Sequence, residues 1–186
     1  MLKIENLKKY FGGVRAVDNC SFEIKPNTIT ALIGPNGAGK STIFNLISGI
    51  SKTDSGEIIF SAKDGSASGG NSIDITNLSP DRISNLGTSR LFQKTNLFNN
   101  LTVRENLLLA LDNEDTKFWK NLVGINKVTK EKEKIVRQAL KEVNLEQFEN
   151  TLARELSYGQ KRLIELQRAI LNPHQFLMLD EPVAGV

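Results

Sequence analysis

One short stretch constrains this chain more than any other part of its sequence. Residues 34–41 read Gly-Pro-Asn-Gly-Ala-Gly-Lys-Ser and fit the pattern G-x-x-x-x-G-K-[ST] in full. The apolar residues 29–33 run straight into it, and residues 40–48 have the apolar spacing of a helix that Gly49 would end. A buried strand, a Gly-rich loop and a helix are the context in which this pattern binds phosphates. The sequence therefore predicts a P-loop for a nucleotide.

The residue types in this loop suit a phosphate. Glycines let the backbone turn so tightly that main-chain N–H groups point inward, and the following helix adds the positive end of its dipole. Lys40 is expected to reach the β- and γ-phosphates, and Ser41 to offer its hydroxyl to Mg²⁺. The nucleotide-binding residues predicted from this motif are Gly34, Asn36, Gly37, Ala38, Gly39, Lys40, Ser41 and Thr42. The simpler interpretation, a Gly-rich turn that matches by chance, does not explain the strand and helix around it.

A second motif lies where an apolar run stops at two acids. Residues 176–179 read Phe-Leu-Met-Leu and are followed by Asp180 and Glu181. Ligands of parallel α/β sheets bind beside the carboxyl ends of strands. Asp180 is therefore placed to hold Mg²⁺ through water, and Glu181 to accept a hydrogen bond from an attacking water. The simpler interpretation is a polar strand end.

Residues 156–160, Leu-Ser-Tyr-Gly-Gln, suggest a second anion site. Ser157 is placed to cap a helix that runs through Arg168, so that its hydroxyl, the main chain of Gly159 and the helix dipole can face an anion. Because the P-loop already holds the terminal phosphate of the chain's own nucleotide, we expect this site to act on a second copy of the protein. Taken alone, the motif is also typical of an ordinary capped helix.

The rest of the chain divides into an early part with strand-like patterns and a later part with helical patterns. Early on, short apolar runs alternate with turns, and Leu2, Ile4 and Leu7 predict an edge strand. Later the sequence is mostly helical, starting with Thr102 and Glu105 in a capping box. The remaining expected elements are strands at 20–24, 57–60 and 89–92, a helix start at 79–81, and a helix at 131–143 with Ile135, Ala139, Leu140 and Val143 along one face.

Together these elements predict an α/β fold. Its P-loop NTPase core would contain a RecA-like sheet with antiparallel edge strands, and an α-helical lobe would be inserted into it. We expect a single domain, 1–186. Within it, residues 1–94 and 169–186 would form the catalytic core with a β-subdomain, and residues 95–168 would form the helical lobe.

Composition favours a globular, cytosolic protein. Of 186 residues, 39% are hydrophobic and 24% charged, and no apolar run approaches the roughly 20 residues that cross a membrane. The N-terminus lacks the apolar core of a signal peptide, and the single cysteine, Cys20, cannot form an internal disulfide. The formal net charge is only +3, and Lys and Glu alternate through residues 130–134, so we expect no nucleic-acid partner.

In this order the motifs resemble those of the nucleotide-binding subunit of an ABC transporter, and the resemblance covers the whole chain. The matching segments are residues 34–41 with Walker A, Gln93 with the Q-loop glutamine, residues 156–160 with the LSGGQ signature, and residues 180–181 with Walker B and its catalytic glutamate. By its residues alone, a glutamine that follows Arg90-Leu91-Phe92 is equally typical of a loop.

The resemblance implies ATP and Mg²⁺ as cofactors. It assigns catalytic roles to Glu181 and Gln93, and it makes Ser41, Gln93 and Asp180 the metal ligands. It also implies that Ser157, Gly159 and Gln160 contact the nucleotide of a second subunit, and that Phe11 stacks on adenine, with Tyr10 as the neighbouring alternative.

Within the family, the match looks closest to the ATP-binding subunits of branched-chain amino-acid importers. The supporting segments are residues 11–13 (Phe-Gly-Gly), 156–162 and 181–186. Tyr158 departs from the glycine of the general signature but is similar to what that subfamily carries. Importers of urea or other amino acids are close relatives, and a soluble ABC ATPase that acts on ribosomes or DNA is the alternative function. A small-molecule P-loop kinase should lack the motif at 156–160, and a non-catalytic binding module remains open.

The resemblance also implies partners and a place in the cell. Two ATPase subunits, identical or different, would pack head to tail around two ATP molecules, and ATP would close the pair. The helical lobe would dock on a membrane permease, which in turn works with a substrate-binding protein. We therefore expect a cytoplasmic protein held peripherally at the cytoplasmic face of the inner or plasma membrane.

The family pattern continues beyond Val186, which falls in the D-loop. His174, the single histidine, precedes the Asp180 strand and so does not match the switch histidine of the family. We therefore expect a C-terminally incomplete fold with a sheet edge beside that strand. Such a chain would bind ATP–Mg weakly and turn over poorly or not at all.

Overall fold

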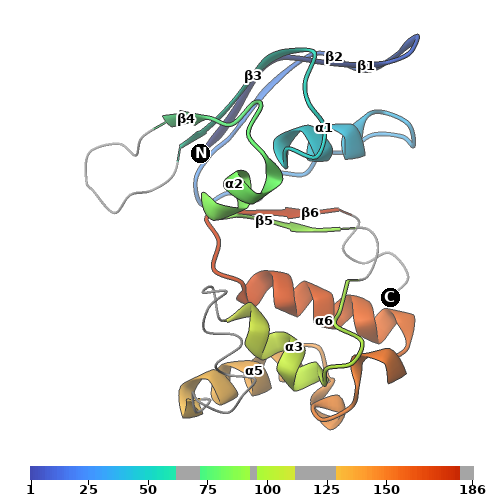
Figure 1. Cartoon of the computed structure of the whole chain (residues 1–186), viewed down its shortest axis with the longest axis vertical. Coiled ribbons are helices and arrows are strands. Elements are labelled where there is room, and N and C mark those ends of the chain that lie inside the picture. The colour runs from blue at the N-terminus through green and yellow to red at the C-terminus, as the bar shows by residue number, and fades with distance from the viewer. Residues whose placement is uncertain (62–71, 93–95, 112–128, 181–186) are drawn as a thin grey trace. The chain divides into compact units, whose positions relative to one another are not determined.

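Residues 1–61, 72–92, 96–111 and 129–180 are described by the computed structural model. Contacts divide the chain into two compact units, Met1–Thr88 and Ser89–Val186, and each is described by itself (Figure 1). The discontinuous core and inserted lobe expected from the sequence stay a prediction.

The first unit is built on a four-stranded antiparallel sheet in the order β2-β1-β3-β4. Its strands are β1 (Leu2–Phe11), β2 (Val14–Ile24), β3 (Ser55–Ser61) and β4 (Ser72–Asp74). Because β1 pairs with both β2 and β3, the prediction of an edge strand at its start is wrong. Alternating burial along a strand shows that one of its faces is covered, but it does not show whether the strand pairs with one neighbouring strand or with two.

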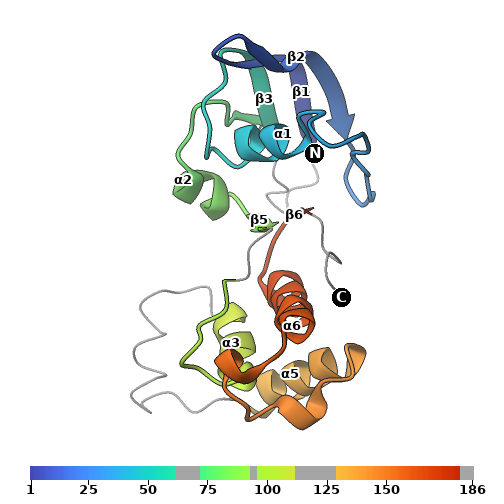
Figure 2. The same cartoon turned by 90° about the vertical axis from the view of Figure 1, so that its right-hand side faces the viewer.

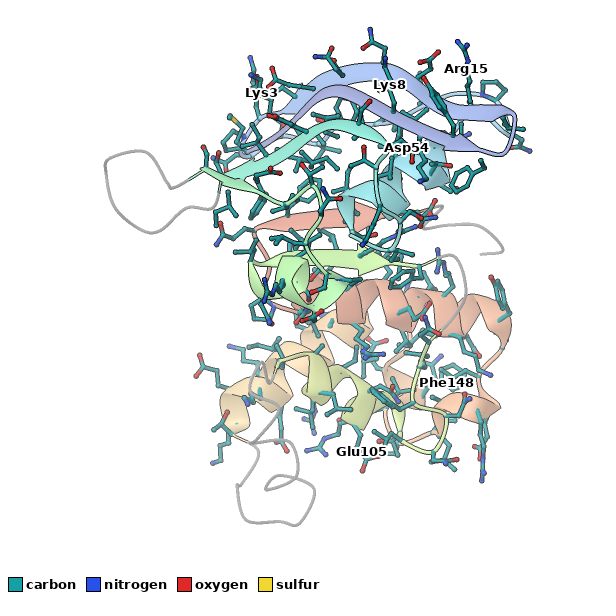
Figure 3. All side chains as sticks on the ribbon, turned by 45° about the horizontal axis from the view of Figure 1, so that its top comes forward. Lys3, Lys8, Arg15, Asp54, Glu105 and Phe148 are labelled. Atoms are coloured by element: carbon teal, nitrogen blue, oxygen red, sulfur yellow. The ribbon has the colours of Figure 1, made fainter. Side chains whose placement is uncertain are left out.

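Side-chain alternation explains how this sheet covers a core. Ile4 and Leu7 of β1 are buried, whereas Lys3 and Lys8 lie on the opposite face (Figure 3). The parity changes at Asn6, whose φ of 50° accompanies a shift of register with both neighbouring strands. This bulge keeps the apolar side chains on one face along a strand that would otherwise turn Leu7 outward.

Two helices complete the first unit. α1 (Lys40–Ile47) contacts β2 and is ended by Gly49, which has a φ of 72° and donates its N–H to Leu46. α2 (Pro80–Asn85) begins after Ser79 with proline in its first turn, as the sequence predicts. The apolar residues that these helices bury are Ile43, Leu46, Ile47 and Ile83.

Residues 29–33 do not form the buried strand that their apolar sequence predicts. No residue from 25 to 39 belongs to a strand, and Ile29 and Ile33 are 103% and 88% exposed. A strand that is apolar on both faces is buried only where neighbouring strands pair with it and other layers cover the sheet. Within the ranges that the structure describes, no strand pairs with this segment. The apolar sequence of this segment favours burial, but it does not specify which strand would pair with it.

The second unit combines a two-stranded sheet with a helical cluster (Figure 2). Its strands are β5 (Thr88–Leu91), which starts at the boundary, and β6 (Phe176–Leu179). Its helices are α3 (Val103–Ala110), α5 (Lys130–Glu142) and α6 (Tyr158–Leu171), with short 3-10 turns η1 (Glu146–Phe148) and η2 (Ala153–Glu155). The three α-helices contact one another pairwise around a core that includes Val103, Leu107, Val136, Leu140, Leu156 and Ile164.

Local signals in the helical cluster are mostly confirmed. Thr102 and Glu105 form the predicted capping box at the start of α3. Glu105 is labelled in Figure 3. The predicted apolar face of α5 is wrong at Ile135, which is 38% exposed, because the buried stripe runs through Val136 instead. No helix in the four described ranges has both the length and the apolar character of a membrane span.

Candidate nucleotide-binding site

The loop ahead of α1 turns on two glycines. Gly37 and Gly39 each have a φ of 82°, a left-handed conformation that residues with a side chain rarely adopt. The N–H of Ala38 closes the turn by donating to the carbonyl of Pro35 at 3.2 Å. A Cβ atom at Gly39 would collide with the carbonyl oxygen of Ala16 on β2. Backbone conformation and the close approach of β2 therefore both require glycine here.

The N-terminus of α1 is open. Gly39 is the N-cap and provides no side-chain hydrogen bond. The first main-chain bond runs from Ile43 N–H to Gly39 O at 2.9 Å, which leaves the N–H groups of Lys40, Ser41 and Thr42 without an intrahelical acceptor. These groups and the positive end of the helix dipole are suited to an anion.

Lys40 adds a full positive charge beside this helix end. Its Nζ donates hydrogen bonds to the carbonyl oxygens of Gly34 at 2.7 Å and Pro35 at 2.8 Å. The loop before α1 therefore holds the ammonium beside the N–H groups of the helix start. A phosphate oxygen bound there would compete with the two neutral carbonyls for this ammonium. Asn36, like Gly34 and Ala38, is exposed. The structure thus brings the predicted P-loop residues together in one loop and one helix start.

Phe11 ends β1 on the hairpin that also carries Ala16, the residue that abuts the loop. Phe11 is 50% exposed, and the ammonium of Lys9 lies 5.3 Å from its ring centroid. Its neighbour Tyr10 donates its hydroxyl to Asp18 at 2.8 Å. Stacking of adenine on Phe11, with Tyr10 as the neighbouring alternative, stays a prediction.

Ser157 and Gln160 cap α6 reciprocally. The Ser157 hydroxyl accepts the N–H of Gln160 at 3.3 Å, and Gln160 Oε1 accepts the N–H of Ser157 at 2.8 Å. The cap that the sequence predicts at Ser157 is confirmed, whereas the reciprocal role of Gln160 is missed, although the spacing of the two residues is that of a capping box. The contacts of both residues with a nucleotide stay a prediction. The hydroxyl accepts in this bond, so its own hydrogen is available to an anion beside exposed Ser157.

Asp180 follows β6 directly and pairs with a buried arginine. Arg90 Nη2 lies 3.2 Å from Asp180 Oδ2, and the two side chains are 8% and 13% exposed. Burial lowers the pKa of Arg90, although the carboxylate of Asp180 opposes that shift. Asp180 N–H also donates to Leu91 O at 3.4 Å, so the carboxyl ends of β5 and β6 lie side by side. The sequence predicts the carboxylate at this strand end but not its arginine partner.

Two charged residues of α6 are buried, and the sequence prediction gives neither of them a role in the site. Arg162 is 1% exposed and Glu165 is 6% exposed. The Arg162 guanidinium donates to the carbonyl oxygens of Phe92 at 2.5 Å and Asp180 at 2.8 Å. On an amphipathic helix these residue types are typical of a solvated face. No local pattern distinguishes them from their exposed neighbours, so only the packing identifies them.

Two predicted site residues, Gln93 and Glu181, lie outside the described residues. Ser41 belongs to the first unit and Asp180 to the second, so the predicted magnesium ligand set stays a prediction. In the part of the chain that the structure describes, no cluster of three or more His, Cys, Asp or Glu side chains could hold a metal ion.

Comparison with known sequences gives one consistent group of relatives. The family model described as "ABC transporter" matches residues 17–184. The probable branched-chain amino acid transport ATP-binding protein LivG of Archaeoglobus fulgidus is 36% identical over the whole chain, which spans 69% of that relative. The high-affinity protein of the same name from Escherichia coli K12 is 34% identical, again over the whole chain and 71% of the relative.

Solved structures agree with the sequence relatives. An ATP-binding cassette of an ABC transporter in its ADP conformation matches the whole chain with a TM-score of 0.72 and 34% identity, over 70% of that structure. A dimeric bacterial ABC transporter cassette matches with a TM-score of 0.73 and 27% identity, over 76% of its length. The resemblance seen in the motifs and the predicted P-loop fold class are confirmed. This chain belongs to the ABC transporter family of ATP-binding proteins.

Proposed function

We propose that this chain binds and hydrolyses ATP as the nucleotide-binding subunit of an importer of branched-chain amino acids. The observation that carries the nucleotide site is the open N-terminus of α1, which follows a loop that turns on left-handed Gly37 and Gly39 and holds Lys40. The substrate class is supported by relatives named as branched-chain amino acid transport ATP-binding proteins, which match the chain from end to end.

Nucleotide binding in this proposal uses the first unit. The N–H groups at the start of α1 and the Lys40 ammonium bind the β- and γ-phosphates, because both present positive charge at one place. Phe11 stacks on the adenine from the end of β1. The Ser41 hydroxyl is an oxygen ligand of the kind that Mg²⁺ prefers, and it is exposed directly after Lys40. Ser41, Gln93 and Asp180 would hold the ion, which neutralises phosphate charge when bound.

Hydrolysis in this proposal depends on positioning. Glu181 accepts a hydrogen bond from the attacking water, and Gln93 orients that water with its side-chain carbonyl. Phosphoryl transfer requires in-line placement and charge stabilisation more than covalent help from the protein, so two well-placed polar side chains suffice.

The proposed assembly contains a second ATPase subunit. Ser157, Gly159 and Gln160 would contact the γ-phosphate bound by the partner, using the exposed Ser157 hydroxyl at the start of α6. A related cassette is described as dimeric, which supports this arrangement. The assembly would bind permease subunits at the cytoplasmic face of the membrane and act indirectly with a substrate-binding protein.

Importers of urea or other amino acids, and soluble ABC ATPases without a permease, are the competing functions. The relatives named above are transport subunits, which favours an importer over a soluble ATPase. Within importers, the permease and the substrate-binding protein select the substrate, so a transport measurement must decide.

The test is uptake by cells that carry this subunit as Lys40→Ala in place of the natural chain. We expect uptake of labelled leucine, isoleucine and valine to be lost, while uptake of an unrelated sugar continues. Loss of urea uptake instead would assign the chain to another importer. Uptake that continues unchanged, with the protein recovered on ribosomes, would overturn the importer assignment.

A further inference from the structure

The buried pair Arg162 and Glu165 holds the main chain at three points in the second unit. Arg162 Nη1 donates to Phe92 O at 2.5 Å, and Arg162 Nη2 donates to Asp180 O at 2.8 Å. Glu165 accepts the main-chain N–H of Asn96. Arg162 and Glu165 also contact each other, with 3.3 Å between Nη1 and Oε2. One turn of α6 therefore binds both sides of the 93–95 segment and the end of β6.

Two of these three points are adjacent in sequence to the two proposed catalytic side chains, and Asn96 lies three residues after Gln93. Phe92 directly precedes Gln93, and Asp180 directly precedes Glu181. The planar guanidinium presents several N–H donors in a fixed fork, so it can bind two carbonyl oxygens in one orientation. A lysine at the same place donates from a single nitrogen, so it does not reproduce the two separate and fixed N–H directions of the guanidinium fork.

Further contacts hold the chain at Asn96 and Asp180. Arg168, which lies further along α6, donates to Asn96 O at 2.8 Å, so both polar groups of the Asn96 main chain bind to this helix. The side chain of Asp180 pairs with Arg90. Because α6 begins at the Ser157 cap, and a helix rises about 1.5 Å per residue, only about 7.5 Å of helix axis separates that cap from Arg162.

We propose that Arg162 and Glu165 are positioning residues for ATP hydrolysis. They fix the main chain next to Gln93 and Glu181, and through α6 they join both to the Ser157 cap. This inference rests on the proposed ATPase function and adds two residues to its machinery. A buried ion pair alone is weak evidence of a stabilising role, since apolar side chains often stabilise as well. The three main-chain bonds are what distinguish a positioning role.

The test compares Arg162→Gln/Glu165→Gln with the wild type. The double variant removes both charges together, so no unpaired charge stays buried, and the amide that Glu165→Gln introduces can still accept a hydrogen bond. Arg104→Gln/Glu133→Gln is the control, because that more exposed Arg–Glu pair joins α3 to α5 at 2.7 Å, away from the Arg162–Glu165 pair on α6. Arg162→Lys is the second variant, and it keeps the charge if the double variant fails to fold.

Three readouts are measured on each protein: the ATP dissociation constant, kcat with KM for ATP, and hydrogen–deuterium exchange at residues 91–97 and 178–182. We expect the Arg162 variants to keep ATP affinity and KM, to lose about tenfold or more in kcat, and to exchange faster in both segments. The control should melt earlier without changing kcat or exchange there.

Other results separate this inference from the proposed function. A wild type that binds no ATP overturns the proposed function, and exchange then decides whether the three main-chain points are held. If the wild type binds ATP, then unchanged kcat and exchange in Arg162→Lys and the double variant overturn the positioning role alone. A fall in kcat that the control shares also overturns it. If the wild type binds ATP but does not hydrolyse it, unchanged hydrogen–deuterium exchange in the variants overturns the positioning role.

Discussion

Gly39 packs so closely against the carbonyl oxygen of Ala16 that no side chain fits between them. The first residue is the N-cap of α1 and the second lies on β2. The contact therefore joins the phosphate-facing end of the helix to the sheet of the same unit. The position of the helix N-terminus, and with it the direction of its N–H groups, depends on the absence of a side chain at one residue.

Gly39→Ala should therefore lower both stability and ATP affinity. The new Cβ atom strains a φ of 82° and collides with Ala16, and strain of this kind costs about 1–3 kcal/mol. Urea unfolding and ATP titration measure the two effects. Gly13→Ala is the matched control, because a Cβ atom there would meet nothing within 4 Å. Equal behaviour of the two variants would contradict the geometric requirement at Gly39.

Ser157→Arg should leave ATP binding by the monomer intact and prevent association of two subunits. The substitution places a bulky cation where the exposed cap of α6 would meet the partner's nucleotide. Sedimentation with and without ATP measures association. Ser157→Thr keeps a hydroxyl that can cap the helix and serves as the control. Loss of ATP binding by the monomeric Ser157→Arg protein would argue against a site that acts on a second subunit.

Asp74 should make the first unit sensitive to acid. Hydrogen bonds from the hydroxyl and N–H of Thr76 hold the pKa of Asp74 below its ordinary value. The same hydroxyl accepts the buried N–H of Ile58 at 2.8 Å, so the carboxylate supports a contact between β3 and the chain after β4. A lowered folded-state pKa adds stability above about pH 3.9, the unfolded value, and that stability is lost as the pH falls through the folded value.

Asp74→Asn removes this titration. The free energy of unfolding of the wild type should exceed that of Asp74→Asn at neutral pH, and the difference should shrink as the pH falls below about 4. Denaturant unfolding at several pH values measures it. A difference that does not change with pH would show that the carboxylate contributes nothing through its ionisation.

Features fixed by a few consecutive residues follow from the sequence. The capping box at Thr102 and Glu105 and the stop of α1 at Gly49 are examples, because each depends on residues within one turn. The same holds for the start of α1 at Lys40. At these positions, the backbone expected from local chemistry agrees with the observed backbone.

Features that depend on distant partners do not follow from the sequence. The apolar run 29–33 predicts a strand but does not name its neighbours, and β1 is an inner strand whose alternation looks like that of an edge. Arg162 and Glu165 are buried only because the ends of β5 and β6 meet α6. A one-dimensional pattern does not contain these contacts, so only the fold identifies the pair.

Calorimetric titration of ATP–Mg into the wild type, Lys40→Ala and Lys52→Ala measures the nucleotide site most directly. Lys40 lies at the open end of α1, whereas Lys52 is an exposed lysine that follows the same helix. We expect the wild type and Lys52→Ala to bind alike. Lys40→Ala should bind roughly 10- to 100-fold more weakly, since it loses a charged hydrogen bond to phosphate. Equal affinity of folded Lys40→Ala and wild type, or no binding by folded wild type, would contradict a nucleotide site at this loop.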